Sequence, residues 1–193
     1  MPRRSTARND MLHSAIALFR QRGVEATSVA DVLEHAGAPR GSVYHHFPQG
    51  RPQLVEEATR SAGAFMGSMI SAGLTTLGPI RTVEAIISGF RDQLLATDFA
   101  SGCPVASVAI EGPQSPAALA AAGESFTSWE DTIAASLWQH GIAQDRARGL
   151  ATMALSAVEG ALLMCKAQRS TRALDRVEKE LMFLLDAVID SSG

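Results

Sequence analysis

Residues 27–47 read TSVADVLEHAGAPRGSVYHHF, and the rest of the chain can be interpreted outward from this stretch. Ser28, with an acid three residues on, is typical of the capping box at the start of a helix. Apolar residues follow at helical spacing until Gly37 ends the helix after about two turns. Pro39 suits the first turn of a second short helix, because its missing N–H would be unpaired there in any case. We expect that second helix to end near Phe47.

The second short helix holds an unusual share of polar rings. The chain has only five histidines and one tyrosine, yet Tyr44, His45 and His46 are consecutive. The histidines could bind a metal, could perform acid–base chemistry, or could contact the surface of another molecule. Adjacent helical residues point about 100° apart, so one metal ion would fit poorly. Catalysis would need a nucleophile or a carboxylate pair nearby, and Cys103 has no evident partner. A further alternative is that the two short helices form a purely structural hairpin.

Two short helices joined by a glycine-containing turn, after a longer helix over 5–22, form the pattern of a helix-turn-helix. The second helix of such a motif lies in the DNA major groove and presents side chains to the bases near its N-terminus. Val43 and Phe47 would then dock on the two preceding helices. The remaining face is the predicted DNA contact, formed by Arg40, Gly41, Ser42, Tyr44, His45 and His46.

Each of these residue types suits a contact with DNA. Arg40 can donate two hydrogen bonds to O6 and N7 of a guanine. Gly41 lets the backbone approach the DNA closely. Tyrosine and histidine can hydrogen-bond to phosphates or stack on sugars and thymine methyl groups.

The whole sequence predicts an all-α, two-domain protein without strand alternation or internal repeats. A helix-turn-helix domain is expected over residues 1–50, and a C-terminal helical bundle over 51–193. Nine helices are expected, over residues 5–22, 28–36, 39–47, 52–73, 79–97, 104–110, 116–140, 143–168 and 171–189.

Composition supports this division. Hydrophobic residues make up 46% of the chain and charged residues 19%, which is enough apolar material for a real core. The net charge of −3 is the sum of +3 over residues 1–51 and −6 over the remaining 142 residues. A basic head on an acidic body fits a module that binds a polyanion, joined to a part with another activity.

Other features narrow the class of protein. Two cysteines, Cys103 and Cys165, make neither a disulfide framework nor a zinc site. No metal site and no cofactor are expected. No stretch resembles a membrane span, and no apolar signal segment follows the basic N-terminus. We therefore expect a cytoplasmic protein without a membrane partner.

The longer stretch TSVADVLEHAGAPRGSVYHHFPQGRPQLVEEA closely resembles the N-terminal signature of TetR-family transcriptional repressors, and the match covers about residues 8–60. The stretches SGCPVASVAIEG and SAVEGALLMCKAQRST resemble the LmrA/YxaF branch of that family. This resemblance implies a homodimer that binds a double-stranded DNA operator and is released by a small-molecule inducer, and it implies no enzymatic activity. It also implies that Thr27 and Ser28 anchor phosphates and that Arg51 supplies a basic contact. One extra residue in PQGR, and Pro52 where many relatives carry an acid, depart from the family pattern.

The C-terminal helices would hold the inducer. Large or flexible apolar residues can form either an ordinary core or an adaptable pocket. If they form a pocket, the inducer is mostly apolar, with a cationic group possible. The predicted ligand-binding residues are Phe65, Met69, Phe90, Cys103, Phe126, Trp129 and Met153.

The last two predicted helices look like a dimer interface, although a core within one chain would look similar. Small residues on the first would allow close helix approach, and leucines on the second supply an apolar face. These residues are Ala154, Ala157, Gly160, Ala161, Leu181, Leu184, Leu185 and Val188.

Two other functions remain open from the sequence. The chain could be a helical ligand-binding protein or an enzyme with an incidental helix-turn-helix. It could also be an architectural protein that binds DNA without sequence preference and has no inducer.

Overall fold

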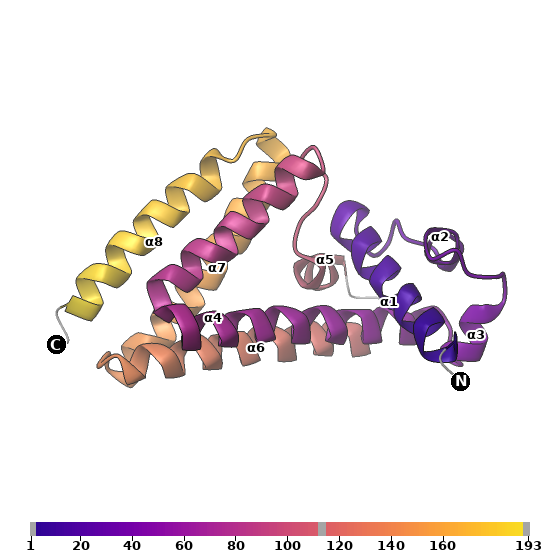
Figure 1. The fold of residues 1–193 in the computed structure, drawn as a ribbon, viewed down its shortest axis with the longest axis horizontal. Helices are drawn as coiled ribbons and strands as arrows, with labels where there is room; N and C mark the ends of the chain where they lie inside the picture. The colour runs from indigo at the N-terminus through magenta and orange to yellow at the C-terminus, as the bar shows by residue number, and fades with distance from the viewer. Residues whose placement is uncertain (1–2, 112–114, 191–193) are drawn as a thin grey trace. The chain divides into compact units, whose positions relative to one another are not determined.

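The computed structural model describes residues 3–111 and 115–190, and it confirms the all-α fold class: no strand occurs in those ranges (Figure 1). The sequence periodicity is helical throughout, and glycine or proline lies at most of the described turns, while the turn between α7 and α8 uses Arg169 with a φ of 49°. The helices are α1 (Arg3–Arg22), α2 (Val29–His35), α3 (Ser42–His46), α4 (Arg51–Ala96), α5 (Pro104–Glu111), α6 (Pro116–Gln139), α7 (Gln144–Gln168) and α8 (Arg172–Asp190).

The described residues form eight helices where nine were predicted. The two helices expected over 52–73 and 79–97 form the single element α4. A break in α4 survives at Gly78, whose φ of 79° and ψ of 174° are not helical, directly before Pro79. The sequence therefore predicted this interruption correctly, but it predicted a gap of several residues between two helices, whereas the backbone leaves helical geometry at Gly78.

The chain forms two compact units, each built from two segments. Unit 1 comprises Met1–Ala64 and Cys103–Ser125, and unit 2 comprises Phe65–Gly102 and Phe126–Gly193. The long helices α4 and α6 therefore contribute to both units. The functional boundary between residues 50 and 51 stays a prediction.

Unit 1 closes around a small apolar core. The side chains of Val43 and Phe47 are 2% and 0% exposed, so α3 docks through the two residues expected to hold it. Helix α1 packs against α2 and α5 (Figure 1). The first turns of α4 complete this core. Its other largest buried side chains are Met11, Phe19, Val32, Leu54 and Val55.

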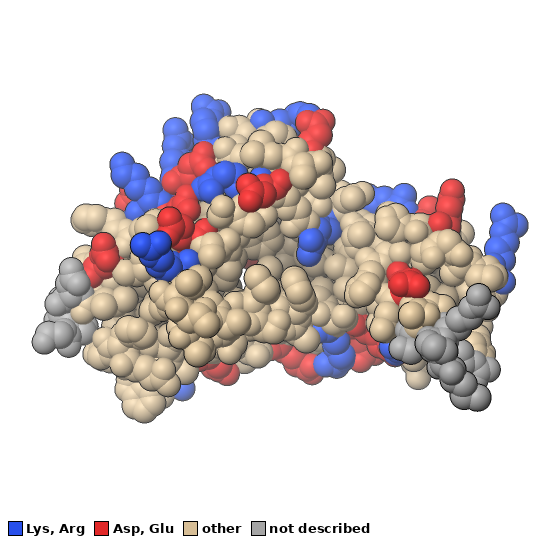
Figure 2. Space-filling view, viewed as in Figure 1, with Lys and Arg blue, Asp and Glu red and all other residues tan. Residues whose placement is uncertain are grey.

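Unit 2 contains the helical hairpin of α7 and α8, which lie along each other (Figure 1). Its core joins buried residues of α6, α7 and α8, including Leu137, Leu150 and Leu185. The face formed by α8 mixes acidic and basic side chains (Figure 2). Arg91 of α4 forms ion pairs there with Asp175, at 2.9 Å, and with Glu178.

Among the described residues, one helix is long and apolar enough to cross a membrane by length and composition alone, and it is α7. The core helix of a soluble protein passes the same test, and Leu150, Ala151, Leu162 and Cys165 of α7 are buried within the fold.

The turn after α1 depends on a glycine. Gly23 has a φ of +87°, and a β-carbon there would overlap the carboxylate of Glu111 at the end of α5. That carboxylate accepts a hydrogen bond from the backbone N–H of Glu25, at 2.8 Å. Left-handed backbone costs a non-glycine residue about 1–2 kcal/mol before any clash.

We therefore expect Gly23→Ala to lower the free energy of unfolding by more than Gly41→Ala does. Gly41 is the matched control, because its φ is +88° and no atom lies within 4 Å of a β-carbon placed there. Urea unfolding followed by circular dichroism measures both. Adding Glu111→Ala should recover the excess loss at Gly23, and equal losses for the two alanine variants would show that the clash does not matter.

Candidate functional site

The recognition element is shorter than predicted. It was expected to begin at Pro39, but α3 begins at Ser42, and Gly41 stands at its N-cap with a left-handed backbone. A residue with positive φ cannot belong to a right-handed helix, so residues 39–41 form a turn instead. The Ser42 hydroxyl stabilises that turn by donating to the Pro39 carbonyl at 2.7 Å.

The six residues predicted for the DNA-contacting face lie in one short segment. Arg40, Gly41, Tyr44 and His45 are exposed, with Tyr44 68% exposed, while Ser42 and His46 are half-buried. The rings of the two histidines meet edge to face at 5.0 Å. Within residues 3–111 and 115–190, no three His, Cys, Asp or Glu side chains are grouped as a metal site requires.

The start of α2 has the predicted capping box. The Ser28 hydroxyl accepts from the Asp31 backbone N–H at 3.2 Å, and the Ser28 N–H donates to the Asp31 carboxylate at 2.8 Å. The hydrogen bond from the Ser28 hydroxyl, and then that from its backbone N–H, hold the pKa of Asp31 below its ordinary value. Ser28 is exposed, but its hydroxyl, at 2.6 Å, and its backbone N–H both donate to the Asp31 carboxylate, so in this structure both donors are engaged within the cap.

Two residues assigned by resemblance are engaged inside unit 1. Thr27 is 2% exposed, and its hydroxyl donates to the Gly23 carbonyl at 2.7 Å. Arg51 is half-buried and donates to the carbonyls of Val24, at 2.7 Å, and of Thr27, at 3.3 Å. The Thr27 hydroxyl and the Nε and Nη2 groups of Arg51 are therefore engaged within unit 1, and Arg51 connects the start of α4 to the turn before α2. Their assignment to DNA contacts stays a prediction.

Several of the described arginines of residues 1–51 are engaged within unit 1. Arg8 forms an ion pair with a carboxylate of α4, and Arg22 forms one with a carboxylate of α2. Burial lowers the pKa of Arg20, which is largely covered. Among the described side chains of residues 6–51, Arg40 is the exposed arginine without an ion pair. Arg40 is therefore distinguished by its exposed position in the turn before α3, and not by the net charge of residues 1–51.

The two cavities described in unit 2 do not bring together the residues predicted to bind the inducer, since of these seven residues only Met153 lines either cavity. Phe90 and Trp129 are 8% and 2% exposed and belong to the core. Phe126 meets the Trp129 ring edge-on at 5.2 Å. The side chains of Phe65, Met69 and Met153 are 62%, 52% and 41% exposed. The apolar pocket therefore stays a prediction.

Cys103 belongs to unit 1, apart from the other six predicted ligand-binding residues. It precedes α5, is 6% exposed, and its sulfur lies 3.5 Å from the backbone N–H of Ala106.

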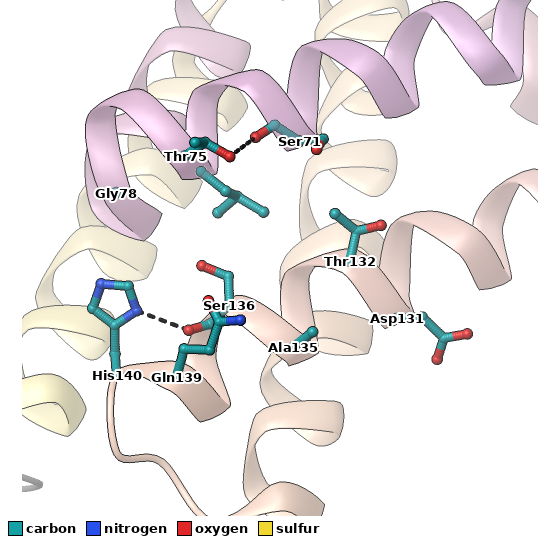
Figure 3. Close-up of a pocket in the computed structure, with 10 residues that line it drawn as sticks. Ser71, Thr75, Gly78, Asp131, Thr132, Ala135, Ser136, Gln139 and His140 are labelled. Carbon is teal, nitrogen blue, oxygen red and sulfur yellow. Dashed lines mark hydrogen bonds between the residues drawn. The ribbon is translucent and has the colours of Figure 1, made fainter.

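Sequence reasoning missed a polar cavity of about 780 Å³ in unit 2. It lies between α4 and α6, near the break at Gly78 (Figure 3). Ser71 and Thr75 contribute from α4, while Thr132 and Ser136 contribute from α6. Their spacing of four residues on each helix was visible in the sequence, but nothing there showed that the two pairs face one cavity.

Two separate parts of the chain match known families of regulators. Residues 11–58 match the family described as bacterial regulatory proteins, tetR family. Residues 79–180 match the C-terminal domain of LmrA/YxaF-like transcriptional regulators.

Individual relatives are similar in sequence to this chain over nearly its whole length. The HTH-type transcriptional regulator Rv0196 of Mycobacterium tuberculosis is 41% identical over 184 residues, covering 92% of this chain and 93% of the relative. YxaF of Bacillus subtilis is 28% identical over 187 residues, covering 96% and 98%. A TetR-family regulator from Agrobacterium tumefaciens has the same fold, with a TM-score of 0.80 at 24% identity over 95% of this chain and 98% of the other. The predicted resemblance is thus confirmed over both the head and the body, and this chain belongs to the TetR family of bacterial transcriptional regulators, in its LmrA/YxaF-like branch.

Proposed function

We propose that this regulator is a cytoplasmic repressor, without enzymatic activity, that binds a double-stranded operator as a homodimer and is released by a small molecule. The observation that carries the proposal is the surface of α3. Its apolar residues Val43 and Phe47 are buried, while Arg40, Tyr44 and His45 are exposed together. A short helix anchored on one face and polar on the other is what major-groove reading requires.

Within this interface we assign two roles. Arg40, in the turn before α3, reads a base edge through its guanidinium, because base contacts concentrate at the N-terminal end of a recognition helix. Tyr44 contacts a phosphate through its hydroxyl. Thr27, Ser28 and Arg51 stay predicted backbone contacts, and DNA binding would have to compete with the hydrogen bonds that these side chains make within unit 1.

The dimer is proposed from the hairpin of α7 and α8. Of the residues expected at the interface, Ala154, Ala161, Leu181 and Leu185 are largely buried within one protomer. An apolar groove of about 280 Å³ nevertheless remains on the hairpin. A second copy covering it would form a four-helix bundle and set the spacing between two recognition helices. The groove is lined mainly by Met153, Ala157, Val177, Leu181 and Leu184.

A mobility-shift assay on the DNA upstream of the protein's own gene tests the proposal. Binding that withstands an excess of unrelated DNA supports a sequence-specific regulator. Equal binding to all DNA would favour an architectural protein. No binding at physiological salt would favour a ligand-binding protein or an enzyme with an incidental helix-turn-helix.

Arg40→Ala should remove most sequence discrimination and leave the fold intact. Losing a bidentate contact to guanine costs about 1–3 kcal/mol, or about 5- to 150-fold in specific affinity. Titrating operator and scrambled DNA in parallel measures the ratio of the two affinities. An unchanged ratio would contradict the assignment of Arg40.

Tyr44→Phe is the companion variant, because it removes one hydroxyl from an exposed ring of the same helix. If that hydroxyl contacts a phosphate, the loss is smaller and similar for every DNA sequence. A shift in the preferred sequence would mean instead that Tyr44 reads a base.

A further inference from the structure

The polar cavity of unit 2 has a chemical character that indicates its ligand. Seven of its ten lining residues carry polar side chains, and they come from α4, from α6 and from His140 directly after α6. Its volume of about 780 Å³ falls within the range of about 300–1,000 Å³ common for small-molecule sites.

The hydroxyls at the cavity are oriented by their own helices. Thr75 donates its hydroxyl proton to the Ser71 carbonyl at 2.8 Å, as drawn in Figure 3. Thr132 donates in the same way to the Ser128 carbonyl at 2.7 Å. A hydroxyl has one proton and two lone pairs, so each of these oxygens keeps only acceptor capacity for a ligand.

His140 presents an acceptor as well. Its Nδ1 lies 2.8 Å from the Ser136 carbonyl oxygen (Figure 3). A carbonyl oxygen can only accept, so Nδ1 carries the proton, and Nε2 of the neutral ring is left with a lone pair. His140 is exposed, which leaves Nε2 accessible to a ligand.

The charge of the lining residues also favours a ligand that donates hydrogen bonds. Asp131 is the one carboxylate among the lining residues, and no lysine or arginine accompanies it. Asp131 lies at the edge of the group in Figure 3 and is exposed. The Gln139 amide and the Ser71 and Ser136 hydroxyls of the lining can donate as well as accept, so the carboxylate decides the sign: it favours a ligand with N–H donors and a positive charge and opposes an anion.

We propose that this cavity binds an organic ammonium compound with several N–H donors, of the polyamine or amino-sugar type. The ammonium group pairs with Asp131, and further donors meet Thr75, Thr132 and His140. This assignment differs from the mostly apolar inducer that the sequence predicts, because this cavity is lined mainly by polar side chains.

The site lies on a helix that also belongs to the DNA-binding unit. Helix α4 runs from Arg51, which fastens the turn before α2, to the break at Gly78, which lines the cavity. A ligand that bridges Ser71 or Thr75 of α4 to α6 changes the position that α4 prefers. This regulatory step rests on the proposed function, whereas ligand binding itself does not.

Calorimetric titration of the full-length protein without DNA tests the binding. The probes are spermidine, the amino sugar kanamycin, uncharged glucose and citrate, at one ionic strength. The two cations should bind, and glucose and citrate should not. Asp131→Asn should weaken cation binding about tenfold, since a charge-assisted hydrogen bond is lost. The matched control is Glu130→Gln, which removes the neighbouring carboxylate outside the cavity lining and should leave the affinity unchanged.

Equal weakening by the two substitutions would mean diffuse attraction to an acidic surface, and it would overturn the proposal. Equal binding of citrate or glucose would do the same. Thr132→Val provides a second variant of similar shape, and it should weaken binding several-fold by removing one acceptor. A mobility-shift assay with spermidine or kanamycin then tests regulation. Cation binding that leaves operator affinity unchanged would support the site while counting against the inducer role.

Discussion

A protein truncated after residue 50 is expected to lose specific operator binding. Its affinity should fall to the level of non-specific DNA binding, about 10³-fold or more below that of the full chain. Mobility shifts with operator and scrambled DNA at physiological salt, beside the full-length protein, measure the loss. Circular dichroism of the fragment shows whether its helices survive.

The structure gives two reasons for this loss. The core beneath α3 includes Leu54, Val55 and Ala58 of α4, each at most 1% exposed, and the truncation removes all three. It also removes α7 and α8, which carry the proposed dimer, so the fragment contacts one half-site only. Tight, specific binding by the fragment would refute both the need for α4 and the proposed dimer mechanism.

Local sequence signals predicted the elements that depend on local chemistry. The capping box at Ser28 and the interruption near Gly78 are set by residues a few positions apart, and both occur in the structure. The recognition helix was predicted to begin three residues too early, because Pro39 suits either a first helical turn or a β-turn. The positive φ of Gly41 resolves that ambiguity, and no neighbouring residue signals it.

Contacts between distant segments could not be predicted in this way. The hydrogen bonds of Arg51 to carbonyls more than twenty residues earlier in the chain have no local sequence signal, and its predicted DNA contact stays a prediction. Glu111 reaches the backbone of Glu25 across 86 positions. The polar cavity likewise depends on the distance between α4 and α6. Sequence periodicity identifies a helix face, but it does not say which other face it meets.

Phe47→Ala should be among the most destabilising single substitutions in the DNA-binding unit. Phe47 ends α3, is fully buried, and has the guanidinium carbon of Arg8 5.1 Å from its ring centre. Truncating a buried phenylalanine to alanine costs about 3–5 kcal/mol, because transfer energy is lost and a cavity is left. Since α3 has only five residues, its packing is what holds it in place, and specific DNA binding should disappear with it.

The matched control is Phe65→Ala, which makes the same change in α4 at a side chain that is 62% exposed. Its free energy of unfolding should change by less than about 1 kcal/mol. Urea unfolding followed by circular dichroism, with operator titration of each folded variant, compares the two. If Phe47→Ala does not fold, Phe47→Leu should give a smaller loss of the same kind, because it keeps most of the apolar volume. Similar stabilities for the Phe47 and Phe65 alanine variants would mean that α3 is not held by Phe47, and the anchored recognition helix would have to be abandoned.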